Sequence, residues 1–317
     1  MGKTKIQWTD ETDNVIVVRG EDGKQDGWYC QKVSPGCAHC YAERMNVQRF
    51  GNGMAYRVPA DGSVPPLMLR EDILAGWARQ QKPRRHFVNS MTDTFAHFVP
   101  HFWIFDILDA MTAAPRQTFQ LLTKRAGRMR EIVGVWLQER GLAEVPANIW
   151  LGVSVENQEW ADKRIPELLG VPAAVRFASV EPLLERVTFS PVIGLREFHG
   201  SSDRYKHVFA DWLWHLDWVI VGGESGPNAR PMHPDWARDL RNQCVNAGVP
   251  FFFKQWGEWL PLDQPAPADF GEWWKEPAHK RHRFPDGVVV ERVGKLAAGR
   301  LLDGREWNEF PQEMSHV

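Results

Sequence analysis

Short apolar runs and longer amphipathic segments alternate along most of this chain. Strand-like runs of apolar and aromatic residues occur at 86–90, 118–122, 149–153, 175–179, 218–221 and 249–253. Segments with helical spacing of apolar positions lie between them, for example at 103–114, 127–140, 157–169 and 234–247. This alternation predicts a parallel sheet with helical crossovers. With one further strand before residue 30, the expected fold class is α/β, a full or partial (β/α) barrel of the TIM type.

Polar residues follow every predicted strand at the same end. These polar groups occur at 89–93, 123–125, 154–156, 179–181, 222–225 and 254–256. In a barrel of parallel strands, active sites are built at the carboxyl ends of the strands. We therefore expect the six groups to meet at one mouth. A lysine buried there is costly without a partner, so Lys254 is predicted to bind a phosphate or to donate a proton.

Two stretches depart from the alternation. Residues 190–216 lengthen the connection before the strand at 218, which predicts an insertion near the barrel wall. A proline-rich segment at 261–269 precedes a turn and a strand at 281–291. We expect residues 1–258 to form the barrel, and residues 259–317 to form a C-terminal extension that packs on it.

Three of the four cysteines, Cys30, Cys37 and Cys40, lie within eleven residues. Three thiolates on one loop can hold a four-iron cluster and leave one iron open for an exchangeable ligand. Zinc is an alternative, with His39 or Cys244 as a fourth ligand, although zinc motifs usually come as two close pairs. Inert thiols are a third interpretation, because short motifs give false positives. Cys244 also fits the apolar spacing of its predicted helix, so a place in the core is expected.

Composition and charge restrict the function classes. The hydrophobic share of 43% and charged share of 25% are typical of a globular protein. A net charge of -2 argues against indiscriminate coating of nucleic acid, which requires many phosphates to be neutralised, but a local basic groove stays open. Lys295, Arg300 and Arg305 add positive charge to the extension. The chain shows neither a signal peptide nor an apolar run of about eighteen residues, so we expect a cytoplasmic protein without a membrane segment.

Seven short motifs together resemble one protein family. They are Lys5-Ile-Gln-Trp-Thr-Asp10, Lys32-Val-Ser-Pro-Gly-Cys37-Ala-His-Cys40-Tyr-Ala-Glu43, Leu122-Thr-Lys-Arg125, Ser179-Val-Glu-Pro182, Val221-Gly-Gly-Glu-Ser225, Phe252-Phe-Lys-Gln-Trp-Gly257 and Ala298-Gly-Arg-Leu-Leu-Asp-Gly304. The chain resembles the phage and prophage three-Cys-motif proteins, which in turn resemble radical S-adenosylmethionine (SAM) enzymes. Two features depart from the usual pattern: six residues, not three, separate the first two cysteines, and segment 14–29 is longer. A loop adapted to a particular substrate is therefore expected beside the cluster.

The resemblance implies a radical SAM enzyme of isomerase or lyase type. Its cofactors would be a [4Fe-4S] cluster and SAM, which together generate a 5′-deoxyadenosyl radical that abstracts a substrate hydrogen. An external electron donor is implied, and a methyltransferase-like partner protein is suspected. The phage setting, the many aromatic residues and the basic extension favour a nucleobase substrate, such as a hypermodified thymidine of phage DNA that is isomerised or cleaved on its side chain. The expected location is then the cytoplasm of the host cell.

The same resemblance assigns SAM-binding roles by position. Ser90 and Asp93 stand where radical SAM enzymes carry the Gly-Gly-Glu element that binds the SAM ammonium. Lys124 is predicted to bind the SAM carboxylate, because a cation suits that group. Ser154 and Glu156 are predicted to bind the ribose hydroxyls.

The literal Gly-Gly-Glu-Ser sequence, at 222–225, follows a much later strand. Glu224 and Ser225 are therefore expected to face the substrate or the ribose of SAM. We predict Glu224 and Lys254 as catalytic residues, and Ser225 as a cofactor-binding residue.

Two other functions stay open. The first is a zinc- or cluster-stabilised module that binds nucleic acid or a partner protein. The second is a hydrolytic barrel that uses Glu156, Glu181 and Glu224 as acid and base. Such a hydrolase would survive the loss of the three cysteines if they were only structural, whereas a radical SAM enzyme would not.

Overall fold

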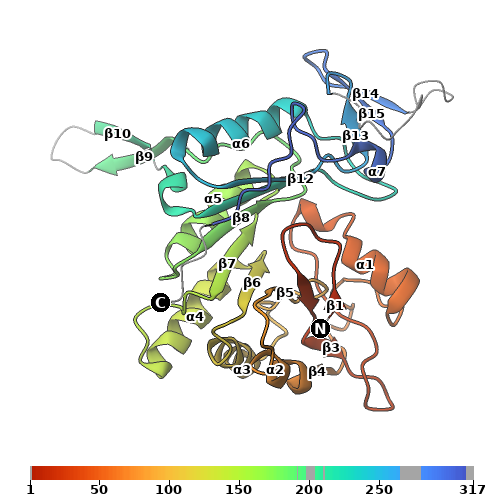
Figure 1. Cartoon of the computed structure of the whole chain (residues 1–317), viewed down its shortest axis with the longest axis vertical. Helices are drawn as coiled ribbons and strands as arrows, with labels where there is room; N and C mark the ends of the chain where they lie inside the picture. Colours follow the sequence, from red (N-terminus) through yellow and green to blue (C-terminus); the bar gives the residue numbers. More distant parts are fainter. Residues whose placement is uncertain (1, 191, 198–203, 210, 265–279, 312–317) are drawn as a thin grey trace.

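An eight-stranded sheet forms the centre of the fold in the computed structural model, which describes residues 2–190, 192–197, 204–209, 211–264 and 280–311 (Figure 1). Its strands, in spatial order, are β1 (Gly2–Lys3), β2 (Glu11–Asp13), β5 (Arg85–Val88), β6 (Thr118–Thr123), β7 (Ile149–Ser154), β8 (Arg176–Val180), β11 (Trp218–Gly222) and β12 (Phe251–Gln255). The β1–β2 pair is antiparallel, and every neighbouring pair from β2 to β12 is parallel. The fold is therefore α/β. Because β1 and β12 are the two edges of this sheet within the described residues, it corresponds to a partial barrel.

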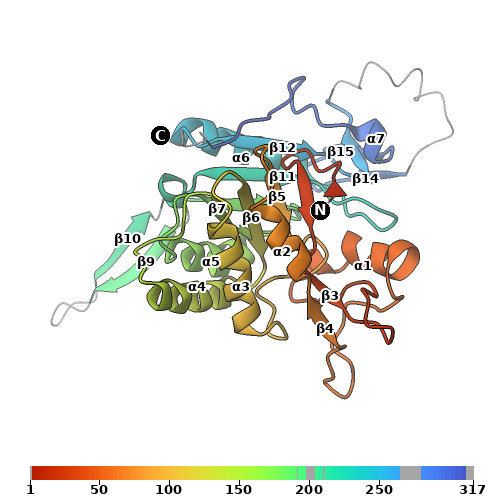
Figure 2. The same ribbon diagram turned by 60° about the horizontal axis from the view of Figure 1, so that its bottom comes forward.

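Helices cover the outer face of the sheet (Figures 1 and 2). They are α2 (Glu71–Trp77), α3 (His101–Thr112), α4 (Ala126–Arg140), α5 (Gln158–Leu169) and α6 (Pro234–Ala247). The six predicted strands and four predicted helices are all present, with ends that differ from the expected ones by at most two residues. Local signals explain the helix ends: Asn157 caps α5 by accepting from the Trp160 amide, and left-handed Gly141 and Gly248 end α4 and α6. Cys244 of α6 is fully buried in the core, as predicted.

Inside the curved sheet, the lining changes from aromatic to polar along the strands. The aromatic end consists of Trp8, Phe87, Trp150, Val175, Phe177, Trp218, Ile220 and Phe252. Gly152 is required there because a Cβ atom would overlap the Phe177 ring. Further along the same strands, Ser154, Ser179 and Lys254 line a cavity at the carboxyl ends. The apolar floor closes one end of the partial barrel, and the polar groups are left at its mouth.

Segments outside the main sheet frame this mouth. The strand β3 (Ile16–Val18) pairs with β4 (Leu67–Leu69), and the helix-like run after Cys40 forms α1 (Tyr41–Met45) followed by a π-helical turn, η2 (Asn46–Phe50). Within the predicted insertion, β9 (Val192–Glu197) and β10 (Arg204–Phe209) form a separate antiparallel hairpin that projects from the body, followed by the 3-10 turn η3 (Trp212–His215) (Figure 1). None of the described helices combines the length and the apolar character that crossing a bilayer requires.

The C-terminal extension has two parts: a small sheet of its own, and a later segment that runs beside the main sheet. Its strands β13 (Trp259–Pro261), β14 (Arg281–Arg283) and β15 (Val289–Arg292) form a small antiparallel sheet, followed by α7 (Lys295–Ala298). The later segment 307–310 runs beside β12, where the Phe253 amide donates to the Trp307 carbonyl, and the Phe310 ring packs against Trp218 at 5.1 Å. Of the predicted proline-rich segment, residues 265–269 lie outside the described residues.

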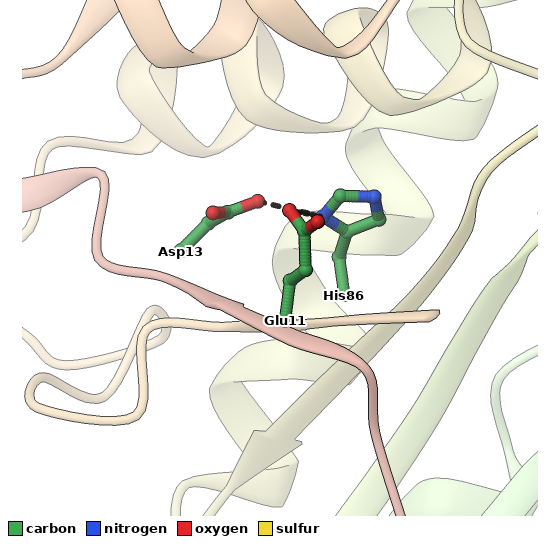
Figure 3. A group of neighbouring side chains, drawn as sticks. All are labelled: Glu11, Asp13 and His86. Carbon is green, nitrogen blue, oxygen red and sulfur yellow. Dashed lines mark hydrogen bonds and ion pairs between the residues drawn. The ribbon is translucent and has the colours of Figure 1, made fainter. Parts of the chain in front are cut away.

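A buried polar chain joins β2 to β5. Glu11 and Asp13 point toward His86, and the Asp13 carboxylate lies 2.8 Å from Nδ1 of His86 (Figure 3). Asp13 also accepts a hydrogen bond from the Trp77 indole at 2.7 Å, and Nε2 of His86 lies 3.3 Å from the Gln117 side-chain oxygen. Glu11, Asp13 and His86 have donor atoms within 4.8 Å of one another, but they do not line the cavity. Their contacts indicate a role in holding the first parallel strand in the sheet.

We expect Asp13→Asn to lower the free energy of unfolding by about 1–3 kcal/mol, because a buried partner of His86 and Trp77 is weakened. Burial alone would raise the pKa of Asp13, but hydrogen bonds from His86 and Trp77 outweigh it and lower the pKa below its ordinary value. The stability from this carboxylate is therefore present above about pH 4 and lost as the pH falls through the lowered pKa. Urea unfolding at about pH 7 and below about pH 4 checks this, and the wild-type advantage should shrink in acid. The exposed Asp72→Asn serves as the control.

Candidate functional site

A cavity of about 730 Å³ lies at the carboxyl ends of the strands. Its volume is in the range of pockets that bind small molecules. Ten of the eleven predicted site residues line it: Cys30, Cys37, Cys40, Ser90, Asp93, Lys124, Ser154, Glu224, Ser225 and Lys254. The structure thus brings together residues from the cysteine loop and from the ends of five strands. Glu156 differs, since it does not line the cavity.

The cysteine loop, residues 30–40, is folded tightly over this cavity. Ser34 begins the 3-10 turn η1 (Pro35–Cys37), where the Cys37 amide donates to the Ser34 carbonyl at 2.9 Å. Cys40 is the N-cap residue of α1. Desolvation, and next the negative charge of Asp93, raise the pKa of Cys30 to about 12, and desolvation also raises the pKa of Cys40. Burial therefore favours the thiol form at these two positions, and a bound metal would favour the thiolate form.

The spacing of the three sulfurs distinguishes a cluster from a single ion. Tetrahedral zinc with Zn–S bonds of about 2.3 Å holds its sulfurs about 3.8 Å apart. Among the described residues, Glu11, Asp13 and His86 form the one three-ligand group whose donor atoms all lie within 4.8 Å, so at least one pair of the three cysteine sulfurs is further apart than this. A four-iron cluster takes each thiolate on a different iron and so holds its sulfurs further apart than one zinc ion does. The sulfur positions are therefore not those of a preformed tetrahedral zinc site, and three thiolates on one loop are a donor set that a four-iron cluster can use.

Glu156 contacts the cysteine loop through Ser34. Its side chain is fully buried, accepts a hydrogen bond from the Ser34 hydroxyl at 2.7 Å and forms an ion pair with Arg164 at 2.8 Å. Lys124 approaches the oxygen that Ser34 contacts, at 3.5 Å. Gly36 lies so close that a Cβ atom there would clash with the Glu156 side chain. Both carboxylate oxygens of Glu156 therefore already have partners within the protein, and its contact with a ribose stays a prediction.

Glu224 supports the other side of the loop. Its carboxylate accepts from the Arg230 guanidinium at 2.6 and 2.8 Å, and Nδ1 of His39 lies 3.2 Å away. Arg230 in turn donates to the Pro35 carbonyl at 3.0 Å. Burial alone would raise the pKa of Glu224, but the hydrogen bonds from Arg230 and His39 lower it. A carboxylate held in this state is a poor proton donor, and its contacts position His39 and Pro35 of the loop.

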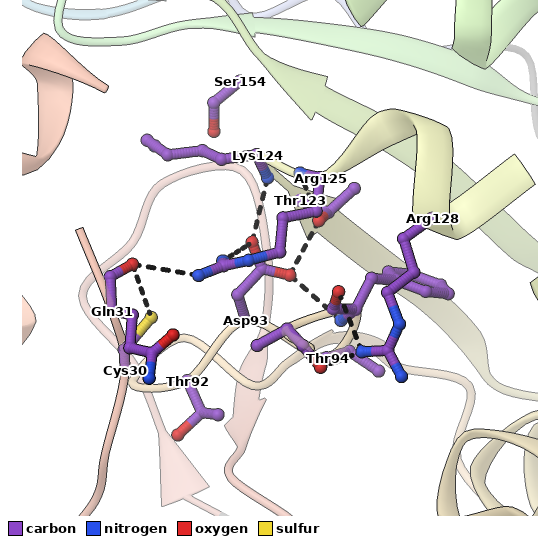
Figure 4. A network of polar contacts seen from close by, with 12 residues as sticks. Cys30, Gln31, Thr92, Asp93, Thr94, Thr123, Lys124, Arg125, Arg128 and Ser154 are labelled. Carbon is purple, nitrogen blue, oxygen red and sulfur yellow. Dashed lines mark hydrogen bonds and ion pairs between the residues drawn. The ribbon is translucent and has the colours of Figure 1, made fainter. Parts of the chain in front are cut away.

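Asp93 lies at the centre of a third network, between the ends of β5 and β6 (Figure 4). It accepts from the Thr123 hydroxyl at 2.7 Å, the Lys124 amide at 3.0 Å and the Arg125 guanidinium at 2.8 Å. Arg125 also donates to the Gln31 carbonyl at 3.0 Å, next to Cys30. The predicted contact of Asp93 with an ammonium group thus competes with several existing partners, and its clearest role is to hold Arg125 against the cysteine loop.

Lys254 faces Glu181 across the mouth. Its ammonium nitrogen lies 2.7 Å from both carboxylate oxygens, and both side chains are mostly buried. Together with the partners of Glu156 and Glu224, this pair means that each carboxylate of the hydrolytic alternative is bound to a cation. The arrangement therefore does not favour an acid–base pair. Trp256, two residues after Lys254, is buried, does not line the cavity and donates to the Leu301 carbonyl from its indole nitrogen.

Several important residues carried no local signal in the sequence. Arg164 is a charged residue on the amphipathic helix α5, and Arg230 lies in the loop between β11 and α6, so neither position suggests contact with a carboxylate near the cavity. Ser179 was part of a predicted strand end, and its hydroxyl and that of Ser154 line the cavity without a hydrogen-bond partner among the described residues. These two hydroxyl groups are available to a ligand.

The chain is similar to one described protein family and to solved structures of a lyase. The sequence model of a family described as "Protein of unknown function (DUF5131)" matches residues 3–311. No curated protein matches the chain. A cysteine-to-serine mutant of spore photoproduct lyase is similar at 11% identity and a TM-score of 0.32, covering 74% of this chain and 62% of the lyase. The spore photoproduct lyase complexed with dinucleoside spore photoproduct is similar at 10% identity and a TM-score of 0.32, covering 73% of this chain and 61% of the lyase. The chain thus spans less than two thirds of the lyases it matches.

Proposed function

The chain belongs to the DUF5131 family, and we propose that it is an enzyme of the radical SAM type. One observation carries the proposal: three cysteines on a single supported loop line a cavity at the carboxyl ends of a partial barrel. Cys30, Cys37 and Cys40 would hold a [4Fe-4S] cluster. When bound and reduced by an external donor, the cluster and SAM supply a 5′-deoxyadenosyl radical that abstracts a hydrogen atom from the substrate.

The chain's own residues provide binding and positioning. Lys124 lies on the cavity wall with its side chain partly exposed, where a cation suits the SAM carboxylate. The free hydroxyls of Ser154 and Ser179 suit the ribose. Glu156 and Glu224 act on the loop from two sides, so the three sulfurs are held before the cofactors bind. Such support reduces the ordering cost of binding.

For the substrate we propose a nucleobase. Trp28, Tyr41 and Phe50 line the cavity, and aromatic rings stack on bases without strong sequence preference. The side chain of a hypermodified thymidine in DNA, isomerised or cleaved, is our first candidate, and a methyltransferase-like protein is a proposed partner. A base in duplex DNA would have to leave the stack to reach the cavity.

The decisive experiment is an anaerobic reconstitution with iron and sulfide, followed by incubation with SAM and a chemical reductant. We expect a brown protein that forms 5′-deoxyadenosine, measured by mass spectrometry, and more of it when the correct nucleoside or DNA is present. Omission of the reductant is the control. A protein with an intact cluster that forms no 5′-deoxyadenosine under any of these conditions would count against the radical mechanism, and a colourless zinc protein would favour the binding module.

A further inference from the structure

Positive charge is left over at one side of the cavity. Of its lining carboxylates, Asp93, Glu181 and Glu224 are each paired with a cation. Glu258 accepts a hydrogen bond from the Gly226 amide at 2.8 Å. The lining cations Arg44 and Lys295, in contrast, make no side-chain hydrogen bond or ion pair within the part of the chain that the structure describes.

Arg44 and Lys295 come from distant parts of the sequence. Arg44 lies on α1, directly after the cysteine loop, and Lys295 is the first residue of α7 in the C-terminal extension. Both views of the molecule place α1 and α7 on the same side (Figures 1 and 2). The pKa of Lys295 is lowered by desolvation and next by the positive charge of Lys254, with a smaller effect of Arg44, while Glu181 and Glu258 oppose the shift. The three cations are therefore electrostatic neighbours.

The loop between them is firmly fixed. The Gly226 amide is bound by Glu258, and the Gly226 carbonyl accepts from Arg292 at 3.0 Å. The Arg44 guanidinium packs directly on Gly226, where a Cβ atom would clash with it. Gly226 also has a positive φ of 112°, which favours glycine. Arg44 is thus positioned by close contact with backbone, although its donors have no acceptor among the described residues.

We propose that Arg44 and Lys295 bind a phosphate group of the substrate, so that the substrate is a nucleotide and not a free nucleoside or base. A guanidinium offers two parallel donors to an oxyanion, and the ammonium of Lys295 adds a second positive charge, which the nearby Glu258 offsets in part. Lys254 contributes less, because Glu181 already neutralises it. The inference rests on the proposed function for the identity of the base, whereas the anion site rests only on these cations.

Equilibrium binding to the purified full-length chain tests the inference. The probes are thymidine, thymidine 5′-monophosphate and a short single-stranded oligothymidylate, and the affinity of the protein for each is measured by calorimetry. The wild type should bind the monophosphate or the oligonucleotide at least about tenfold more tightly than thymidine, and this preference should fall about three- to tenfold in Arg44→Gln and in Lys295→Gln. Lys295→Arg should restore it. Lys163→Gln, which changes an exposed cation of α5 that does not line the cavity, is the matched control. The two phosphate probes show whether a free nucleotide or a nucleic-acid strand is the better ligand.

Two results would overturn the inference. One is equal affinity of the wild type for thymidine and both phosphate-bearing probes. The other is a preference that survives both substitutions while SAM binding falls, which would assign the two cations to the SAM carboxylate. Failure of the radical mechanism gives a different result, because the phosphate preference would persist in a protein that forms no 5′-deoxyadenosine.

Discussion

Replacement of Cys37 by alanine is expected to abolish both the brown colour of the reconstituted protein and its formation of 5′-deoxyadenosine. In the proposed cluster each of the three thiolates would hold one iron, so the loss of one leaves too few protein ligands to retain it. Cys37 lines the cavity and is only partly buried, and removal of its sulfur should leave the core intact. Visible absorbance, iron and sulfide content and product formation are the three measurements.

Cys244→Ala is the matched control for this experiment. Cys244 is fully buried on α6, in the apolar cluster between sheet and helices. Its substitution removes a sulfur from the core and lowers stability, but it should leave cluster content and 5′-deoxyadenosine formation at the wild-type level. A coloured, active Cys37→Ala protein, or a Cys244→Ala protein that folds without retaining iron, would contradict the assignment of the cysteine loop as the metal centre.

Substitution Glu156→Ala is expected to lower the free energy of unfolding by about 3–5 kcal/mol, because the Arg164 guanidinium is left as an uncompensated buried charge. Arg164 is almost completely buried and lies over the Trp160 ring at 4.1 Å. Burial already lowers its pKa, and the Glu156 charge opposes that effect. The substitution also removes the partner of Ser34, so cluster retention should fall with stability. Urea unfolding and iron content measure the two effects.

The chain offers a control of the same chemistry. Glu159, at the start of the same helix, pairs with Lys163 at 2.5 Å, but both side chains are more than half exposed. Glu159→Ala should therefore lower the free energy of unfolding by only about 0.3–0.5 kcal/mol. Replacing both buried partners, in Glu156→Gln with Arg164→Met, should recover much of the lost stability, since no charge remains buried. A similar cost for Glu156→Ala and Glu159→Ala would show that the buried pair does not support the loop.

Much of the barrel follows from local patterns. The apolar run at 149–153 and the amphipathic segment at 157–169 each encode which face is buried, and Asn157 marks the helix start. The polar residues after the strands also met at one cavity, because parallel strands share a direction. The sequence did not predict the ion-pair partners of the site carboxylates. Asp93, Glu156 and Glu224 were expected to contact a ligand, and in the structure they pair with Arg125, Arg164 and Arg230, respectively.

The sequence by itself determined the order of strands and helices, the end of the sheet at which polar groups gather, and the loop that carries three cysteines. Those features depend on periodicity and spacing over a few residues. Only the tertiary structure decided which charges neutralise each other, because Ser34 and Glu156 are 122 positions apart and His39 and Glu224 are 185 apart. Contacts over such separations depend on strand order and register, which bring the two sides of the cysteine loop against the residues that follow β7 and β11. The same arrangement leaves Arg44 and Lys295 without an ion pair among the described residues.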